Sequence, residues 1–176
     1  MSRRTTNPKR ILAIDPTSRG FGYVVLEWPL VLVDWGVKST RNEKEANTLS
    51  KMTTLIRHYQ PECVVVQDCS GTGKLRCPRI QDLIDSIRRL ATQKGIRSRK
   101  ISSKTLIKVF SAFGARTKHE IAQVVAKQLP ELAPHLPRYR KPWMSEDYWM
   151  AIFDAAALAL TYFYSRSVRA RKGPEP

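Results

Sequence analysis

The sequence predicts a single α/β domain with a mixed five-stranded sheet, in which three antiparallel strands are followed by parallel strands and helices flank the sheet. The chain has 176 residues, 42% of them apolar, which is enough for one domain with a hydrophobic core. Near its start, three strand-like segments follow one another with only short turns between them, the pattern of an antiparallel meander. Residues 63–66, Cys-Val-Val-Val, form an apolar run typical of a central strand buried on both faces.

The first predicted hairpin carries a charged residue in an apolar setting. Residues 11–14 read as a buried strand, and a second strand resumes at Phe21 after a short turn with a proline, a serine and a glycine. Asp15 stands between the apolar run and the turn. An ionised carboxylate beside a sheet is costly unless a metal ion or hydrogen-bond donors compensate its desolvation. A role as a simple cap of the turn is the alternative for Asp15.

The remaining elements follow from apolar spacing and from helix-stopping residues. They are a third strand over residues 31–37, a helix over 43–59, a strand over 63–66, a helix over 80–93, a short fifth strand over 96–101, helices over 103–110 and 118–129, and a last helix from Ser145 to about Ser165. Residues 130–142 hold four prolines and are expected to be irregular. Ser145 would cap the last helix, with Glu146 and Asp147 in its first turn. Residues 1–9 and 167–176 are expected to be flexible basic ends of a domain over residues 10–166.

The net charge of +16 indicates a polyanionic partner. Nucleic acid is the first candidate and an anionic membrane surface the second. Basic residues are spread along the chain, whereas a membrane-binding protein more often concentrates them on one amphipathic helix. No apolar run reaches the length of about 18 residues that a membrane span needs. The distribution of charge therefore favours nucleic acid and predicts no membrane partner.

The three cysteines, Cys63, Cys69 and Cys77, are odd in number and lack a CxxC spacing. This argues against a structural zinc site and against a disulfide framework. The three cysteines are therefore expected to be reduced thiols in a cytosol-like compartment. This predicts a cytoplasmic protein, associated with the nucleoid. The basic start MSRRTTNPKR resembles a transit peptide but is short, so a disordered arm is preferred and organellar targeting stays an alternative.

Acidic residues occur where the predicted sheet and the last helix converge. Asp15 and Asp68 follow buried strands, Asp154 lies inside an otherwise apolar helical stretch, and Asp147 or Glu146 precedes it. Carboxylates that converge without basic residues between them repel each other unless they share divalent cations, and hard oxygen ligands select Mg²⁺ or Mn²⁺. A centre with two such ions hydrolyses phosphodiesters by activating water and stabilising the leaving oxygen.

Basic residues near these acids suggest contacts to phosphate. Residues 70–74 resemble a phosphate-binding loop only superficially, since the Walker spacing is absent, so a mobile, positively charged loop that contacts phosphate is expected. Lys104, Lys108 and Lys118 are expected to face a common region at the starts of two short helices. The alternative is that these three lysines are ordinary solvated side chains at the surface. The predicted nucleic-acid-binding residues are Lys74, Arg76, Arg79, Lys104, Lys108 and Lys118.

Four motifs in this order resemble the RuvC family of Holliday junction resolvases, within the RNase H-like superfamily. ILAIDPTSRGFGYVVLE is similar to the family's first strand with its Asp-Pro-Gly-Ser turn, PECVVVQD to the strand with the second acid, and FDAAALAL to the final helix. Ile107-Lys108 with Gly114-Ala115-Arg116-Thr117-Lys118 is similar to the stretch with two functional lysines. The resemblance covers about residues 10 to 162.

The resemblance implies an RNase H-like fold and a Mg²⁺-dependent endonuclease that cleaves four-way DNA junctions with two ions per site, where Mn²⁺ can substitute. Asp15 would bridge the ions, Asp68 and Asp154 would flank them, and Asp147 would be a further ligand. Lys108 and Lys118 would neutralise charge at the scissile phosphate. A two-fold symmetric junction implies a homodimer.

Three departures from the family pattern bear on activity. Thr17 replaces a glycine of the turn, Asp68 replaces a glutamate, and Ala151 stands where a second acid usually precedes the last one. On a continuous helix Asp147 would share a face with Asp154, because the two are seven residues apart. Ala151 supports the alternative of an inactive nucleic-acid-binding protein. The segment over residues 69–77 also lacks an aromatic residue that could wedge into a junction. A sugar kinase or ATPase of the actin–hexokinase type is a further alternative. It is disfavoured because that fold needs two such domains and 176 residues supply only one.

Overall fold

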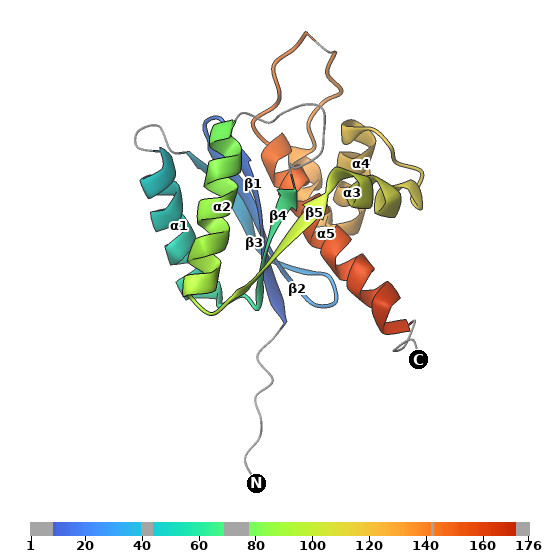
Figure 1. The fold of residues 1–176 in the computed structure, drawn as a ribbon. Helices are drawn as coiled ribbons and strands as arrows, with labels where there is room; N and C mark the ends of the chain where they lie inside the picture. Colours follow the sequence, from blue (N-terminus) through green and yellow to red (C-terminus); the bar gives the residue numbers. More distant parts are fainter. Residues whose placement is uncertain (1–8, 40–43, 69–77, 142, 172–176) are drawn as a thin grey trace.

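The computed structural model describes residues 9–39, 44–68, 78–141 and 143–171 and shows a five-stranded sheet covered by helices on both faces (Figure 1). The elements are β1 (Arg10–Thr17), β2 (Gly20–Glu27), β3 (Val31–Ser39), α1 (Lys44–Tyr59), β4 (Cys63–Asp68), α2 (Pro78–Gln93), β5 (Arg97–Ser102), α3 (Ser103–Ser111), α4 (Lys118–Gln128), the 3-10 helix η1 (Pro130–His135) and α5 (Met150–Arg171).

The strand order is β3-β2-β1-β4-β5. β1 and β2 pair antiparallel, as do β2 and β3, whereas β4 runs parallel to β1 and β5 runs parallel to β4. This confirms the predicted mixed sheet of three antiparallel strands followed by parallel ones. The parallel arrangement brings the carboxyl ends of β1, β4 and β5 to one edge of the sheet.

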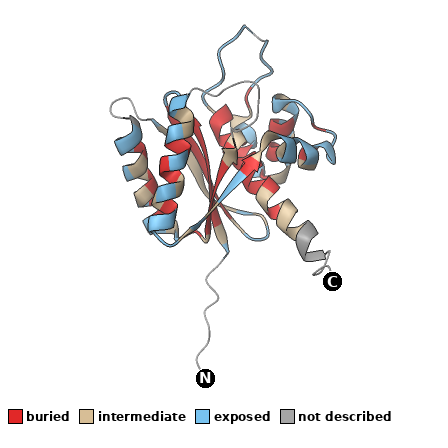
Figure 2. Cartoon of the chain, viewed as in Figure 1, coloured by how far each residue is buried: buried red, intermediate tan, exposed pale blue. Residues whose placement is uncertain are grey.

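The sheet separates two hydrophobic cores, and neighbouring residues of a strand point into different cores. Ile11 and Ala13 of β1 belong to the core under α3, α4 and α5, whereas Leu12 and Ile14 belong to the core under α1 and α2. Figure 2 shows the buried strands between the outward-facing exposed sides of the helices. This alternation decides which polar side chains at the strand ends can meet.

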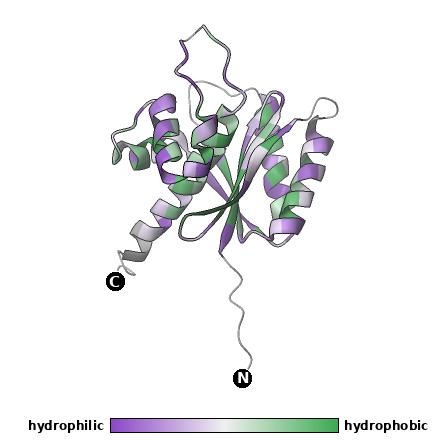
Figure 3. Ribbon diagram, turned by 180° about the vertical axis from the view of Figure 1, so that it is seen from behind, coloured by the Kyte–Doolittle hydropathy of each residue, from purple (hydrophilic) through white to green (hydrophobic). Residues whose placement is uncertain are grey.

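Helix α5 packs directly onto β1 and β2, and the view from behind in Figure 3 shows it crossing the sheet. A Cβ atom at Gly22 would lie 2.3 Å from the carbonyl oxygen of Ala151. Only a residue without a side chain fits there, because real Cβ contacts are not this short. The small residues at both positions therefore set the close approach of α5 to the strand that follows Asp15.

The last helix differs from the prediction at both ends. It begins at Met150 and not near Ser145, and it continues to Arg171. Asp147 Oδ1 accepts a hydrogen bond from the N–H of Trp149, as the side chain of a residue preceding a helix does, so Asp147 lies before the helix and not within it. Beyond Ser165, the Arg166 side chain pairs with Glu62, which holds the next turn of the helix against the domain. Residues 130–135, expected to be irregular, form η1.

Some predictions fall outside the described residues. These are the flexible arm over residues 1–8, the end of the tail over residues 172–176, and the positively charged segment over residues 69–77, which holds two of the cysteines. In the described part of the chain, Cys63 is a buried free thiol. There, no helix is both long enough and apolar enough to cross a bilayer.

Candidate functional site

Two carboxylates, one from β1 and one from α5, form the centre of the site. Asp15 is only 3% exposed and shares its strand face with Ile11 and Ala13, so it points toward α5. The Asp154 side chain is 22% exposed. Burial, followed by the negative charge of Asp15, raises the pKa of Asp154 to about 7, against the lowering effect of Lys118. Two like charges close together in a poorly solvated place create a demand for a cation.

Lys118 supplies positive charge to this pair from the first residue of α4. Its Nζ lies 2.7 Å from Asp154 Oδ2 and also contacts Glu146 Oε1. Burial alone would lower the pKa of Lys118, but the ion pair with Asp154 and the contact with Glu146 raise it above its ordinary value. The Thr117–Glu120 capping box fixes the start of α4 and thereby the position of the lysine.

Glu146, and not Asp147, joins this cluster. Asp147 Oδ1 accepts a hydrogen bond of 2.9 Å from the N–H of Trp149, and both Glu146 and Asp147 line an open cavity of about 890 Å³ beside the β1–β2 turn. The expectation that Asp147 shares a helix face with Asp154 is wrong in its premise, because Asp147 precedes the helix. The ion pair of Glu146 with Lys118 spans two segments, so no local sequence pattern indicates it.

At the end of β4, the pleat places Gln67 on the same face as Asp15. Gln67 pairs in register with Ile101, which belongs to the core under α5. Its Nε2 donates a hydrogen bond of 3.0 Å to Ser103 Oγ at the start of α3. Sequence reasoning did not select Gln67, although counting every second residue from Cys63 and Val65 would have found it.

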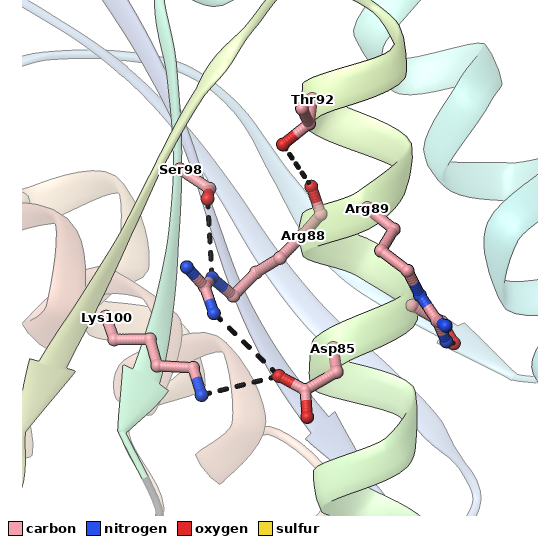
Figure 4. Close-up of polar contacts among 7 residues, drawn as sticks. Asp85, Arg88, Arg89, Thr92, Ser98 and Lys100 are labelled. Atoms are coloured by element: carbon pink, nitrogen blue, oxygen red, sulfur yellow. Dashed lines mark hydrogen bonds and ion pairs between the residues drawn. The ribbon is translucent and has the colours of Figure 1, made fainter.

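The same pleat directs Asp68 toward the opposite face, where α2 lies. Asp68 pairs in register with Ser102, which shares its strand face with Ser98 and Lys100. Both of those side chains contact α2, since Lys100 Nζ lies 3.3 Å from Asp85 and Arg88 donates to Ser98 (Figure 4). The structure therefore brings Asp15, Asp154 and Lys118 together and places Asp68 on a different strand face from Asp15.

The other predicted basic residues lie at the surface. Lys104 and Lys108 are exposed and one helical turn apart on α3, and Arg79 is exposed in the first turn of α2. Lys74 and Arg76 lie outside the described residues. Of the three lysines expected to share one region, Lys118 is the one that contacts the acids.

The donor set is compatible with one hydrated divalent cation. Within the described ranges, no three side chains of the His, Cys, Asp and Glu types converge as a complete metal site. Mg²⁺, however, commonly keeps several waters and is held by one or two carboxylates. The buried pair Asp15 and Asp154 offers hard oxygen ligands, and the raised pKa of Asp154 shows that further positive charge would stabilise the ionised pair. The described residues therefore fit a divalent metal ion.

Solved structures of Holliday junction resolvases share this architecture. RuvC of Thermus thermophilus in complex with a Holliday junction substrate aligns with a TM-score of 0.63 at 20% identity, over 90% of this chain and 96% of that one. The yeast mitochondrial Holliday junction resolvase aligns with a TM-score of 0.60 at 12% identity, over 96% of this chain and 85% of the other. The fowlpox virus resolvase, in complex with Holliday junction DNA, aligns with a TM-score of 0.50 at 14% identity, over 89% of this chain and 98% of its own.

These likenesses confirm the predicted RNase H-like fold and its structural similarity to RuvC. No protein-family model matches the sequence, and no curated protein matches it significantly. At 20% identity or below, the agreement shows the fold. An activity is therefore inferred from this chain's own residues.

The raised pKa of Asp154 predicts that the metal-free protein loses stability as the pH rises from about 4 to about 7. The native state holds a proton that the unfolded state, with an ordinary aspartate pKa, has already released, so raising the pH favours unfolding over this window. Urea unfolding in EDTA at several pH values would measure this. Asp154→Asn should show a weaker fall over the same window, and equal pH profiles for both proteins would contradict the prediction.

Proposed function

We propose that this protein is a divalent-metal-dependent, structure-selective endonuclease that cleaves four-way DNA junctions, the activity of a crossover junction endodeoxyribonuclease. The observation that carries the proposal is the pair of carboxylates Asp15 and Asp154, held close together with Lys118 beside them. The fold that positions them is shared with resolvases solved in complex with junction DNA. The net charge of +16 suits a nucleic-acid substrate.

Asp15 and Asp154 would hold Mg²⁺, and a bound ion would supply activation of water and stabilisation of the leaving oxygen in phosphodiester hydrolysis. Asp15 contributes a carboxylate that the rigid β1 strand holds in a fixed position. Lys118 favours the ionised form of Asp154 and places positive charge where a phosphate would acquire negative charge. Glu146 orients Lys118 from the opposite side through its ion pair.

Two ions and a ligand role for Asp68 stay predictions, whereas Glu146 replaces Asp147 as the further acid proposed to assist the site. The pleat of β4 favours Gln67 over Asp68 as the residue nearer to Asp15, and its amide oxygen is a hard donor of the kind that Mg²⁺ accepts. Exposed Lys104 and Lys108 on α3 are proposed to contact phosphates beside the site. A homodimer is proposed, because a two-fold symmetric junction has two equivalent strands to cut.

The experiment that tests the function is incubation of the purified protein with a labelled four-way junction and with a linear duplex of the same sequence. Cleavage of the junction in Mg²⁺ or Mn²⁺, its loss in EDTA, and little cleavage of the duplex are the expected results. Junction binding without cleavage in either metal would instead support the alternative of an inactive RNase H-fold nucleic-acid-binding protein. Ala151, buried on α5 where the family usually has an acid, is the observation behind that alternative.

Glu146 and Asp147 offer a matched test of which acid assists the site. Glu146→Gln removes the charge that pairs with Lys118, and turnover should fall ~10-fold, equivalent to about 1.4 kcal/mol of barrier. Asp147→Asn keeps an oxygen acceptor for the N–H of Trp149, and activity should stay close to that of the parent. Single-turnover cleavage rates would measure both. A large loss for Asp147→Asn with none for Glu146→Gln would reinstate Asp147 as the functional acid.

A further inference from the structure

The segment between η1 and α5 forms a projecting loop with a fixed base. Figure 1 shows it rising above the edge of the sheet where β1 and β4 end. At its base, the rings of His135 and Trp149 are 4.4 Å apart, and the Trp35 ring packs 4.8 Å from His135 and 6.4 Å from Trp149. Such a loop with joined ends is an Ω-type loop, a class that is frequently functional. Its residues 136–141 and 143–148 are described here and are called the 136–148 loop.

This loop exposes large apolar side chains, although the Tyr139 ring packs 5.6 Å from that of His119 and the Tyr148 ring 5.2 Å from that of Trp149. Trp143 is 78% exposed, Tyr139 71%, Tyr148 57% and Met144 50%. These four are half of the eight large hydrophobic residues exposed in the described part of the chain, so the exposure is concentrated in one loop. A concentration of this kind on a soluble domain marks a binding surface.

The aromatic residues of the loop alternate with cations. Arg138, Arg140 and Lys141 are exposed and surround Tyr139 in the sequence. Lys141 Nζ lies 5.3 Å from the centroid of the Trp143 ring, a cation–π contact. The tip is also held by two hydrogen bonds, from the Met144 N–H to Lys141 O at 3.0 Å and from Arg140 to the Met144 carbonyl. The indole therefore lies among cations, next to residues that hydrogen-bond to one another.

Exposed rings among cations are the surface that binds unpaired nucleic-acid bases. Each base can stack its π-face on an aromatic ring, while the neighbouring cations bind the phosphates. Bases inside a duplex are already stacked on one another, so such a surface distinguishes open or branched DNA from paired DNA. Glu146 lies in the same loop and contacts Lys118, which links this surface directly to the acidic site.

We propose that the 136–148 loop is a base-stacking platform, with Trp143 as its main contact and Tyr139 beside it, that binds unpaired bases of branched DNA next to the cleavage site. This inference rests on the proposed function and adds the part of the protein that recognises the open region of the substrate. Arg138, Arg140 and Lys141 bind the phosphates of the same strand.

The test is equilibrium binding in EDTA to three probes: a single-stranded oligothymidylate, a four-way junction, and a linear duplex. Trp143→Ala and Trp143→Leu should each weaken binding to the single strand and the junction ~5–100-fold, the range for the loss of a stacked base. Trp143→Phe should stay close to the parent because it keeps an aromatic face. Duplex affinity should not change. Trp28→Ala is the matched control, since Trp28 is 46% exposed but lies in the β2–β3 turn, away from the loop.

A second readout reports stacking itself. A 2-aminopurine placed at an unpaired position should lose emission on binding the parent and Trp143→Phe, and keep it with Trp143→Ala. The inference is overturned if Trp143→Leu binds as tightly as the parent, or if the duplex loses affinity in the same proportion. A change of sedimentation from dimer to monomer in Trp143→Ala, with unchanged affinity per chain, would also overturn it and assign the loop to contact between copies.

Because these readouts need no metal and no cleavage, they separate the two proposals. Trp143-dependent binding by a protein that never cleaves would keep the platform and refute the endonuclease. Cleavage with no effect of Trp143 substitutions on binding would refute the platform alone.

Discussion

Asp15→Asn should abolish Mg²⁺-dependent cleavage, lowering the rate by at least ~10³-fold, because a metal ligand contributes several kcal/mol of charge stabilisation in the transition state. Junction binding should change only a few-fold, since Asp15 is 3% exposed and does not contribute to the basic surface. Single-turnover cleavage and equilibrium binding of the same junction would measure both effects. Cleavage by the variant at the parent's rate would refute the site.

The same substitution has a second expected effect that does not depend on activity. Removing the charge of Asp15 relieves its repulsion of Asp154, so the pKa of Asp154 should fall and the metal-free protein should melt at a higher temperature. In the parent, Mg²⁺ should raise the melting temperature, whereas in Asp15→Asn that increase should be small. Asp85→Asn is the matched control, because Asp85 is an exposed acid on α2 that pairs with Arg88 and Lys100 (Figure 4). It should change neither cleavage nor the response to Mg²⁺.

Lys118→Ala should lower turnover of the bound junction ~10²-fold while weakening binding far less, the size of effect seen when a preorganised charge at a reacting group is removed. Lys118 contacts both Asp154 and Glu146, so its loss leaves two carboxylates without their counter-ion. Lys108→Ala is the matched control, because Lys108 is exposed on α3. It should reduce affinity slightly, in proportion to a single phosphate contact, and leave the turnover of the bound complex intact.

The stability of Lys118→Ala checks the same contact independently. In metal-free buffer, the variant should be less stable than the parent, and more so at pH 8 than at pH 6, because Asp154 is ionised above a pKa of about 7. Mg²⁺ should restore part of the lost stability. Weaker binding in both variants, with the turnover of the bound junction intact, would instead assign both lysines to the general basic surface. Equal losses of turnover would place Lys108 at the scissile phosphate beside Lys118, as the resemblance implies.

The order and type of the elements and the main charged residues of the candidate site could be predicted from the sequence alone. Apolar runs and their stops predicted the five strands, the meander and the long helices, because burial imposes a period of two on strands and of 3.6 on helices. Asp15 and Asp154 were recognisable because a carboxylate inside an apolar run is costly without compensation. Lys118 was predicted as one of three lysines near the starts of two short helices, and the resemblance assigned it a role at the scissile phosphate.

In two pairs of neighbouring polar residues, only the three-dimensional arrangement shows which residue lies near Asp15, Asp154 and Lys118. At the end of β4, a shift of one residue reverses the face, so Gln67 lies with Asp15 while Asp68 lies toward α2. Before α5, Asp147 accepts a hydrogen bond from the N–H of Trp149 and precedes the helix, and Glu146 makes the contact with Lys118. Both outcomes depend on strand register and on contacts between distant segments. The local periodicity of a sequence, which records only whether a position is buried, contains neither.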